Sequence, residues 1–159
     1  MNVKILCVGK IKEKFYRDAV LEYSKRLSKY GSLDIIEVSD EKTTENSSET
    51  EISIIKDKEG ERILKHIKEK DYVIALAILG KQQDSVAFSQ FIENLGVTGQ
   101  SNICFVIGGS LGLSDQVLKR SNYQISFSKM TFPHQLMRVI LLEQIYRAMR
   151  IMNNEPYHK

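Results

Sequence analysis

The architecture that this sequence predicts is organised around the segment Asn102–Phe132, NICFVIGGSLGLSDQVLKRSNYQISFSKMTF. Its first part, Ile103–Ile107, is a continuous apolar run of β-branched and aromatic residues, which is typical of a strand buried on both faces of a parallel sheet. The glycine-rich turn Gly108–Ser114 follows, and its final serine is a favourable N-cap for a short helix, Asp115–Arg120. A second strand, Tyr123–Phe127, then leads into a polar loop.

The turn Gly108–Ser114 is a candidate ligand site, because a strand that ends in glycines before a helix exposes backbone N–H groups. Its spacing is G-G-x-x-G, which differs from the dinucleotide fingerprint G-x-G-x-x-G. No Gly-Lys-Ser/Thr follows, as it would in a P-loop. The sequence therefore excludes these two modes of nucleotide binding, and a tight turn without a ligand is the alternative.

Strands and helices alternate along the rest of the chain. The predicted elements are strands at Val3–Val8, Leu33–Val38 and Tyr72–Leu79, and helices at Lys12–Tyr30, Glu49 or Glu51 to Glu69, Ser85–Leu95 and from Pro133 onward. This alternation predicts an α/β fold with a mostly parallel sheet and helices on both faces. The polar segment Ser39–Thr50 is predicted to be a surface loop, too short to link two domains, so residues 1–159 are expected to form one domain.

Two of the predicted helices carry specific expectations. The second contains Gly60, which is expected to weaken its middle. The first should pack against the sheet through a stripe of apolar residues, formed by Phe15, Ala19, Tyr23 and Leu27.

The last predicted helix is apolar around most of its circumference, from Leu136 to Met152. One sheet face cannot bury so many apolar side chains, so the helix is either threaded through its own fold or shared with a second copy. Because an exposed stripe of this size would be a liability on a monomer, the pattern favours a homodimer.

The formal net charge of +3 is too small to identify a nucleic-acid partner, but its distribution is uneven. Residues 119–159 contain seven lysines and arginines against two acids, whereas residues 40–61 contain eight acids and three lysines. A basic C-terminal part suits a phosphate-rich partner, and an ordinary solvated surface is the alternative.

Cys7 and Cys104 both lie inside apolar runs and are expected to be small core residues. Their separation fits neither a disulfide framework nor a metal-ligand pattern, so no metal is predicted. The N-terminus leads directly into a strand, and no apolar run is long enough to cross a bilayer. We therefore expect a cytoplasmic protein without a membrane partner.

Three motifs together resemble a known family. Phe105–Gly112, FVIGGSLG, is similar to the glycine motif of the SPOUT (α/β-knot) RNA methyltransferases. The segments Ser126–His134, SFSKMTFPH, and Pro156–Lys159, PYHK, narrow the resemblance to the ribosomal RNA large-subunit methyltransferase H family. The resemblance covers nearly the whole chain.

The resemblance implies a C-terminal trefoil knot, in which the last helix passes through a loop formed earlier in the C-terminal half. It also implies S-adenosylmethionine (SAM) as the cofactor, bent within the knot. Leu76 would offer an apolar wall for adenine, and Gly108 would allow close approach of the backbone. The third contact segment would supply backbone donors and acceptors, and it comprises Phe127, Ser128, Lys129, Met130, Thr131 and Phe132.

The activity implied by the resemblance is methylation of N3 of pseudouridine 1915 in 23S rRNA. Since the chain has no separate RNA-binding domain, an assembled ribosome is favoured over free rRNA as the substrate. The N3 proton must be removed, and the candidate catalytic residues are Tyr157, His158 and Arg147, with Arg150 on the same helix face as Arg147. His158 could accept the proton or only contact the RNA, and without the resemblance the last residues could be a frayed tail.

Two other functions compete with an rRNA methyltransferase. A non-enzymatic α/β RNA-binding or ribosome-associated protein would also account for the basic C-terminal part. A flavodoxin-like nucleotide-binding protein is compatible with the β-α alternation, but the missing phosphate motif argues against it.

Overall fold

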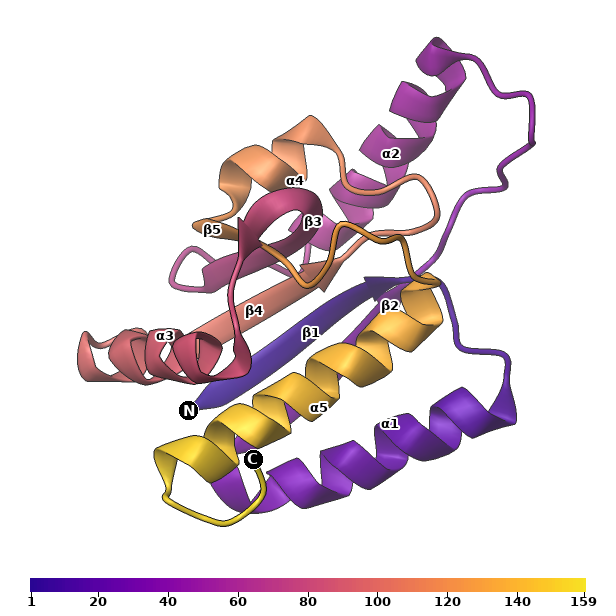
Figure 1. The fold of residues 1–159 in the computed structure, drawn as a ribbon. Coiled ribbons are helices and arrows are strands. Elements are labelled where there is room, and N and C mark those ends of the chain that lie inside the picture. The colour runs from indigo at the N-terminus through magenta and orange to yellow at the C-terminus, as the bar shows by residue number, and fades with distance from the viewer.

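The computed structural model describes residues 1–159, whose five strands form one sheet with the order β2-β1-β4-β3-β5 (Figure 1). Every pair of neighbouring strands is parallel, which confirms the predicted α/β class. The elements in chain order are β1 (Asn2–Val8), α1 (Lys14–Leu27), the 3-10 helix η1 (Ser28–Tyr30), β2 (Ser32–Val38), α2 (Glu49–Leu64), β3 (Tyr72–Gln82), α3 (Ser85–Val97), β4 (Asn102–Ile107), α4 (Asp115–Arg120), β5 (Tyr123–Ser126) and α5 (His134–Met152).

The apolar runs of β1 and β4 form the centre of the sheet. Val3 pairs with Leu33 of β2 on one side and with Ile103 of β4 on the other, and β4 also pairs with β3. The residues Ile103–Ile107 are all buried, because helices cover both faces of this central strand. Their burial explains why the run contains no polar side chain.

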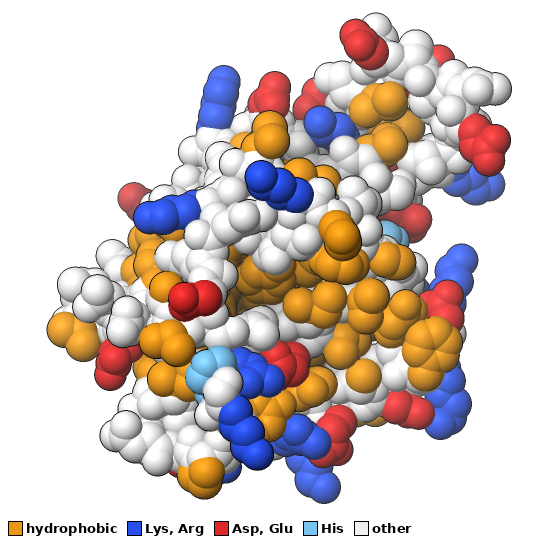
Figure 2. Space-filling model, viewed as in Figure 1, with side chains coloured by type: hydrophobic (Ala, Val, Ile, Leu, Met, Phe, Trp, Pro, Cys, Tyr) orange, Lys and Arg blue, Asp and Glu red, His pale blue; other side chains and the backbone are white.

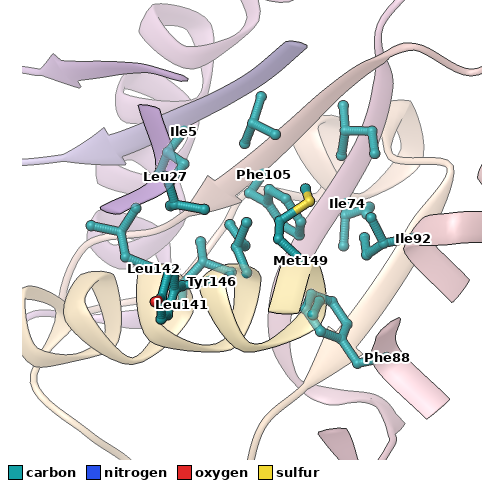
Figure 3. Close-up of a cluster of buried hydrophobic side chains, with 14 of the residues drawn as sticks. Ile5, Leu27, Ile74, Phe88, Ile92, Phe105, Leu141, Leu142, Tyr146 and Met149 are labelled. Carbon is teal, nitrogen blue, oxygen red and sulfur yellow. The ribbon is translucent and has the colours of Figure 1, made fainter. Parts of the chain in front are cut away.

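The helices form two layers, one on each face of the sheet, as predicted. On one face α2 and α4 cover a smaller cluster that includes Ile63, Val106 and Val117. On the other face α1, α3 and α5 pack against the sheet and against each other (Figure 1). Figure 3 shows this larger cluster, which contains Ile5, Leu27, Ile74, Phe88, Ile92, Phe105, Leu141, Leu142, Tyr146 and Met149.

The strand β3 contains the whole predicted range Tyr72–Leu79 and continues to Gln82, but its end is irregular. Leu76 and Lys81 both pair with Ile125 of β5, so the intervening segment Ala77–Gly80 forms a bulge that leaves the ladder. At its tip Leu79 is 96% exposed. The apolar residues at the end of the predicted strand are therefore part of β3 but not of the core.

Two helix predictions also need correction. Phe15 lies in the first turn of α1 and is 65% exposed, so the inward-facing stripe begins further along the helix. Helix α2 ends at Leu64 rather than at Glu69, and its N-terminal half projects from the body of the protein (Figure 1).

Gly60 is buried where α2 crosses the start of α4, and a Cβ there would collide with the Ser114 hydroxyl. Close packing of two helices thus accounts for this glycine.

Helix α5 begins at His134 with Pro133 as its N-cap, one residue later than predicted. Its inner face is fully buried, whereas Leu136, Val139 and Ile140 on the outer face are only partly covered. Figure 2 shows hydrophobic side chains gathered over this part of the surface. The homodimer and the threading of α5 through a knot stay predictions. No helix of the protein is long and apolar enough to span a membrane.

Candidate active site

The three segments predicted to hold the cofactor meet at one edge of the sheet. Gly108 and Phe127 directly follow the carboxyl ends of β4 and β5, and Leu76 is the last residue of β3 before its pairing with β5 is interrupted. The three strands are neighbours in the sheet. In open α/β sheets this edge is where ligands bind. Figure 2 shows a hollow lined by hydrophobic side chains, where Figure 1 has the end of β3 and the loop after β5 above α5. The fold therefore brings the predicted segments together.

The glycine turn is closed by its own backbone. Gly109 and Gly112 form an isolated antiparallel bridge, with Gly112 N–H donating to Gly109 O over 3.1 Å. A Cβ on Gly108 would lie 2.8 Å from the carbonyl carbon of Gly112, so a side chain at Gly108 would force the turn open. The predicted N-cap is confirmed, since Ser114 Oγ accepts from Val117 N–H over 3.3 Å.

The loop after β5 is organised by two serines. Ser126 Oγ donates to Ser128 O over 3.0 Å, and Ser128 Oγ accepts from Met130 N–H over 2.9 Å. Phe127 anchors the start of the loop by packing edge-on against Phe88 of α3, with ring centroids 6.2 Å apart. Lys129, Met130 and Thr131 are exposed.

A buried carboxylate that the sequence did not reveal lies behind the glycine turn. Glu59 of α2 is buried, and its Oε2 accepts from Glu41 N–H over 3.0 Å. A Cβ on Gly109 would lie 3.3 Å from Glu59 Oε1, so the carboxylate lies directly against the turn. Burial raises the pKa of Glu59. No sequence signal separated Glu59 from the other acids of segment 40–61.

The three candidate catalytic residues do come together, at the C-terminal end of α5. The guanidinium of Arg147 lies over the ring of Tyr157, 4.7 Å from its centroid, and Arg147 Nη1 is 3.1 Å from His158 Nδ1. The Tyr157 ring also packs edge-on against Tyr146, with centroids 4.9 Å apart. The tail therefore packs against α5 and is not frayed, and its role in the reaction stays a prediction.

Glu143 holds this group together and was also missed from the sequence. Its Oε1 accepts from Arg147 Nη2 over 2.6 Å and from the Tyr157 hydroxyl over 3.1 Å. Burial, followed by the charge of Glu143, raises the pKa of Tyr157 to about 12, so the phenol keeps its proton at neutral pH. The spacing of Glu143 and Arg147 was visible, but an i,i+4 ion pair on a helix is common and carries no functional signal.

Three of the seven cations in residues 119–159 are paired with carboxylates within the fold. Arg138 is only 2% exposed and pairs with Glu37 over 2.6 Å. Arg147 pairs with Glu143, and Arg150 pairs with Glu155 over 2.8 Å. Lys119, Arg120, Lys129 and Lys159 form no salt bridge, so the charge distribution does not decide between an enzyme and a non-enzymatic RNA-binding protein.

The tail and the cofactor segments lie toward opposite ends of α5. The loop after β5 leads into His134, and Arg147 is thirteen residues further along the helix, about 20 Å at the usual rise. No hydrogen bond or aromatic contact joins Tyr157 or His158 to the three cofactor segments. One chain alone therefore does not assemble the complete predicted site.

The two cysteines lie in the core of the sheet. Cys7 and Cys104 are both buried and unpaired, as predicted. Burial raises the pKa of each thiol to about 12, so neither provides a thiolate nucleophile at neutral pH. No group of three or more potential metal-binding side chains is present.

Comparison with protein families identifies the class. The model described as "Predicted SPOUT methyltransferase" matches residues 1–158. A solved Haemophilus influenzae structure, described as a probable methylase family protein, shares the fold with a TM-score of 0.54 at 12% identity, over 99% of this chain and 70% of that one. A Legionella pneumophila protein in complex with the bound cofactor SAM aligns with a TM-score of 0.50 at 11% identity, over 94% and 66%. The class that the fold and the sequence define is the SPOUT methyltransferases.

Much more similar relatives narrow this class. Two proteins named "Ribosomal RNA large subunit methyltransferase H", from the Langeland and Alaska E43 strains of Clostridium botulinum, are 66% and 62% identical to this chain. Each alignment covers 159 residues and the whole of both proteins. The chain belongs to this family, as the three sequence motifs had indicated.

Proposed function

We propose that this protein transfers a methyl group from SAM to N3 of pseudouridine 1915 in the 23S rRNA of the assembled ribosome. Family membership and the names of the 62–66% identical relatives support methylation of large-subunit rRNA. The observation that carries the proposal is the meeting of Leu76, Gly108 and Phe127 at one edge of the sheet, together with the ordered cluster of Tyr157, His158 and Arg147.

The residues at the sheet edge fit SAM as a cofactor. The hydrophobic hollow in Figure 2 suits an adenine ring. In this proposal half-buried Leu76 contacts that ring. The backbone of the glycine turn and of the loop Phe127–Phe132 offers donors and acceptors for the polar parts of the molecule. When bound, SAM supplies a methyl group on a positively charged sulfur, which is transferred without a metal.

The contacts of His158 favour a role as a hydrogen-bond donor. Arg147 has only donors, so its Nη1 must donate to Nδ1 of His158. A neutral histidine that accepts at Nδ1 carries its hydrogen on Nε2, and this N–H can donate to a carbonyl oxygen of the acceptor base. Such a donor stabilises the negative charge that develops when N3 loses its proton. Accepting that proton on His158 would first require its bond with Arg147 to break.

Tyr157 has a complementary role. Because its raised pKa keeps the phenol protonated, Tyr157 cannot take the N3 proton at neutral pH. In this proposal the Tyr157 ring, whose orientation Tyr146 and Arg147 fix, contacts the acceptor base. We assign removal of the N3 proton to water.

A two-fold dimer through the outer face of α5 would complete the site. Two antiparallel copies of this helix would bring the tail of one subunit to the cofactor segments of the other. The partly covered Leu136, Val139 and Ile140 supply the apolar surface for such a contact, and each fully buried aliphatic side chain contributes about 1.5–3 kcal/mol. In this proposal residues 1–159 act as one catalytic domain in the cytoplasm, where ribosomes are found.

Methyl transfer from labelled SAM to assembled ribosomes, large subunits and naked 23S rRNA tests this function. We expect incorporation at the single proposed nucleotide in assembled particles, and none when that nucleotide is uridine instead of pseudouridine. Incorporation at another nucleotide would refute the assigned target. Tight ribosome binding without any methyl transfer would support a non-enzymatic function instead.

A further inference from the structure

The chain reverses direction sharply after α5. Asn153 N–H donates to Met149 O over 3.1 Å, and Asn154 adopts a left-handed conformation with φ of 54°. Glu155 N–H then donates to Arg150 O over 2.8 Å. This turn directs the side chain of Glu155 back toward η1, which lies 125 residues earlier in the sequence.

The Glu155 carboxylate accepts three side-chain hydrogen bonds at this turn. Its Oε1 accepts from the Tyr30 hydroxyl over 2.6 Å, and its Oε2 accepts from Lys29 Nζ over 2.9 Å and from Arg150 Nη1 over 2.8 Å. Arg150 Nη2 also donates to Pro156 O over 2.9 Å. One side chain thus connects the tail to both η1 and α5.

This cluster differs from the ordinary ion pairs on the surface. The pair of Lys14 and Asp18 on α1 is a single contact between side chains that are 80% and 56% exposed. In contrast, Arg150 and Glu155 are 19% and 28% exposed, and the carboxylate has partners in two separate elements. Isolated exposed pairs contribute little, whereas networks of charge-assisted hydrogen bonds fix geometry.

We propose that Glu155 is a positioning residue for methyl transfer, because it anchors the tail so that Tyr157 and His158 face the acceptor base in one orientation. Only Pro156 separates Glu155 from Tyr157, and the proline ring restricts the backbone between them. Glu155 itself contacts none of the cofactor segments and acts only through the tail. This inference rests on the function proposed above.

The test compares Glu155→Ala and Glu155→Gln with Asp18→Ala, which removes a carboxylate from a surface ion pair far from the tail. The measurements are SAM affinity by calorimetry, kcat and KM for methyl transfer to ribosomes, and the rate at which a carboxypeptidase releases the last residues. For Glu155→Ala we expect kcat to fall roughly 10- to 100-fold, as misplaced reacting groups typically cause, with SAM affinity within about twofold. Release of the tail should be at least about tenfold faster.

The conservative variants separate positioning from loss of fold. Glu155→Gln keeps an oxygen for Tyr30 but no charge for Lys29 and Arg150, so its kcat should lie between those of the wild type and Glu155→Ala. Tyr30→Phe removes only the shortest hydrogen bond and should shift kcat and tail release in the same direction by a smaller factor. If Glu155→Ala does not fold, these two variants still test whether Glu155 positions the tail for methyl transfer.

Wild-type kcat and wild-type tail protection in Glu155→Gln and Glu155→Ala would overturn the proposal. So would faster tail release with unchanged kcat, because the anchor would then have no role in the reaction. If the wild-type protein itself methylates no ribosomal substrate, the proposed function fails and the positioning role fails with it. The carboxypeptidase rates would then still show whether Glu155 holds the tail.

Discussion

The hydroxyl of Tyr157 donates to Glu143 Oε1 over 3.1 Å, which joins the chain terminus to the middle of α5. The same carboxylate oxygen also accepts from Arg147, so Glu143 connects the tail to the guanidinium that contacts His158. Glu143 is half-buried and Tyr157 packs against the main hydrophobic cluster. The tail is therefore part of the folded structure.

Deletion of Pro156–Lys159 should lower stability and also abolish methyl transfer. The Tyr157 ring loses an edge-on contact and a cation–π contact, and such contacts are worth about 0.5–1.5 kcal/mol and 0.5–2 kcal/mol respectively. Urea unfolding should therefore show a loss of about 1–3 kcal/mol, whereas calorimetry should show nearly unchanged SAM affinity. A truncated protein that methylates ribosomes at the full rate would exclude any role for the tail in the reaction.

Mixing two inactive variants should restore activity if the site is shared between subunits. One variant lacks Pro156–Lys159, and the other carries Leu76→Glu, which places a charge at the apolar wall for adenine. Random exchange would make about half of the dimers mixed, each with one complete site, so about a quarter of wild-type activity is expected. No activity after subunit exchange would indicate that tail and cofactor segments of the same chain act together.

Ser128→Ala should weaken SAM binding with little effect on the fold. The variant loses the acceptor of Met130 N–H, so the loop after β5 is less well fixed when it contacts the cofactor. We expect SAM affinity to fall roughly 3- to 10-fold, equivalent to one ordinary hydrogen bond of about 0.5–1.5 kcal/mol. Ser121→Ala, which removes a bond to Leu118 O at the end of α4, is the matched control. Equal affinities in both variants would contradict the assignment of this loop.

Gly60→Ala should destabilise the protein although alanine is the better helix former. Its Cβ would collide with the Ser114 hydroxyl, and separating α2 from α4 should cost about 1–3 kcal/mol. Gly96→Ala in α3 is the control, because the nearest atom to its new Cβ is Met1 Cε at 3.5 Å, an ordinary contact distance. Thermal unfolding of both variants measures the difference. A melting temperature for Gly60→Ala at or above that of the wild type would contradict the crowding.

Acidification should remove the contribution of Glu155 to stability. The hydrogen bond from Lys29, followed by that from Tyr30, lowers the pKa of Glu155 below its ordinary value of 4.5. A carboxyl group with a lowered pKa in the folded state stabilises the fold above its unfolded pKa and loses this effect as the pH falls through its folded pKa. Wild type should therefore be more stable than Glu155→Gln at pH 7, and the difference should shrink below pH 4. A stability difference that is constant from pH 7 to pH 3 would contradict the stabilising role of the ionised Glu155 carboxylate.

The sheet and the positions of most elements were predictable from the sequence. The run Ile103–Ile107 of β4 has no polar residue, and Ser114 is the N-cap of α4 as predicted. The bulge after Leu76 could not be predicted, because its exposed Leu79 belongs to the same apolar run as the buried residues before it. Only the pairing with β5 distinguishes the two parts of the run.

The candidate site was predictable only in part. The motifs identified the cofactor segments, and the order of β4, β3 and β5 places them side by side. The roles of Glu59, Glu143 and Glu155 depend on contacts between residues distant in sequence or on one helix face, and an isolated carboxylate in a sequence carries no such information. The ion pairs of Arg138, Arg147 and Arg150 could not be predicted for the same reason.

The central position of β1 has a consequence for the order of folding during synthesis. Asn2 pairs with Asn102, so one side of β1 has no partner strand until about a hundred more residues have left the ribosome. Until then β1 and β2 can form only a two-stranded unit with an apolar, unpaired edge, which is marginally stable in water and prone to association. Contacts this distant in sequence also slow folding. The nascent chain should therefore depend on protection by chaperones until β4 is complete.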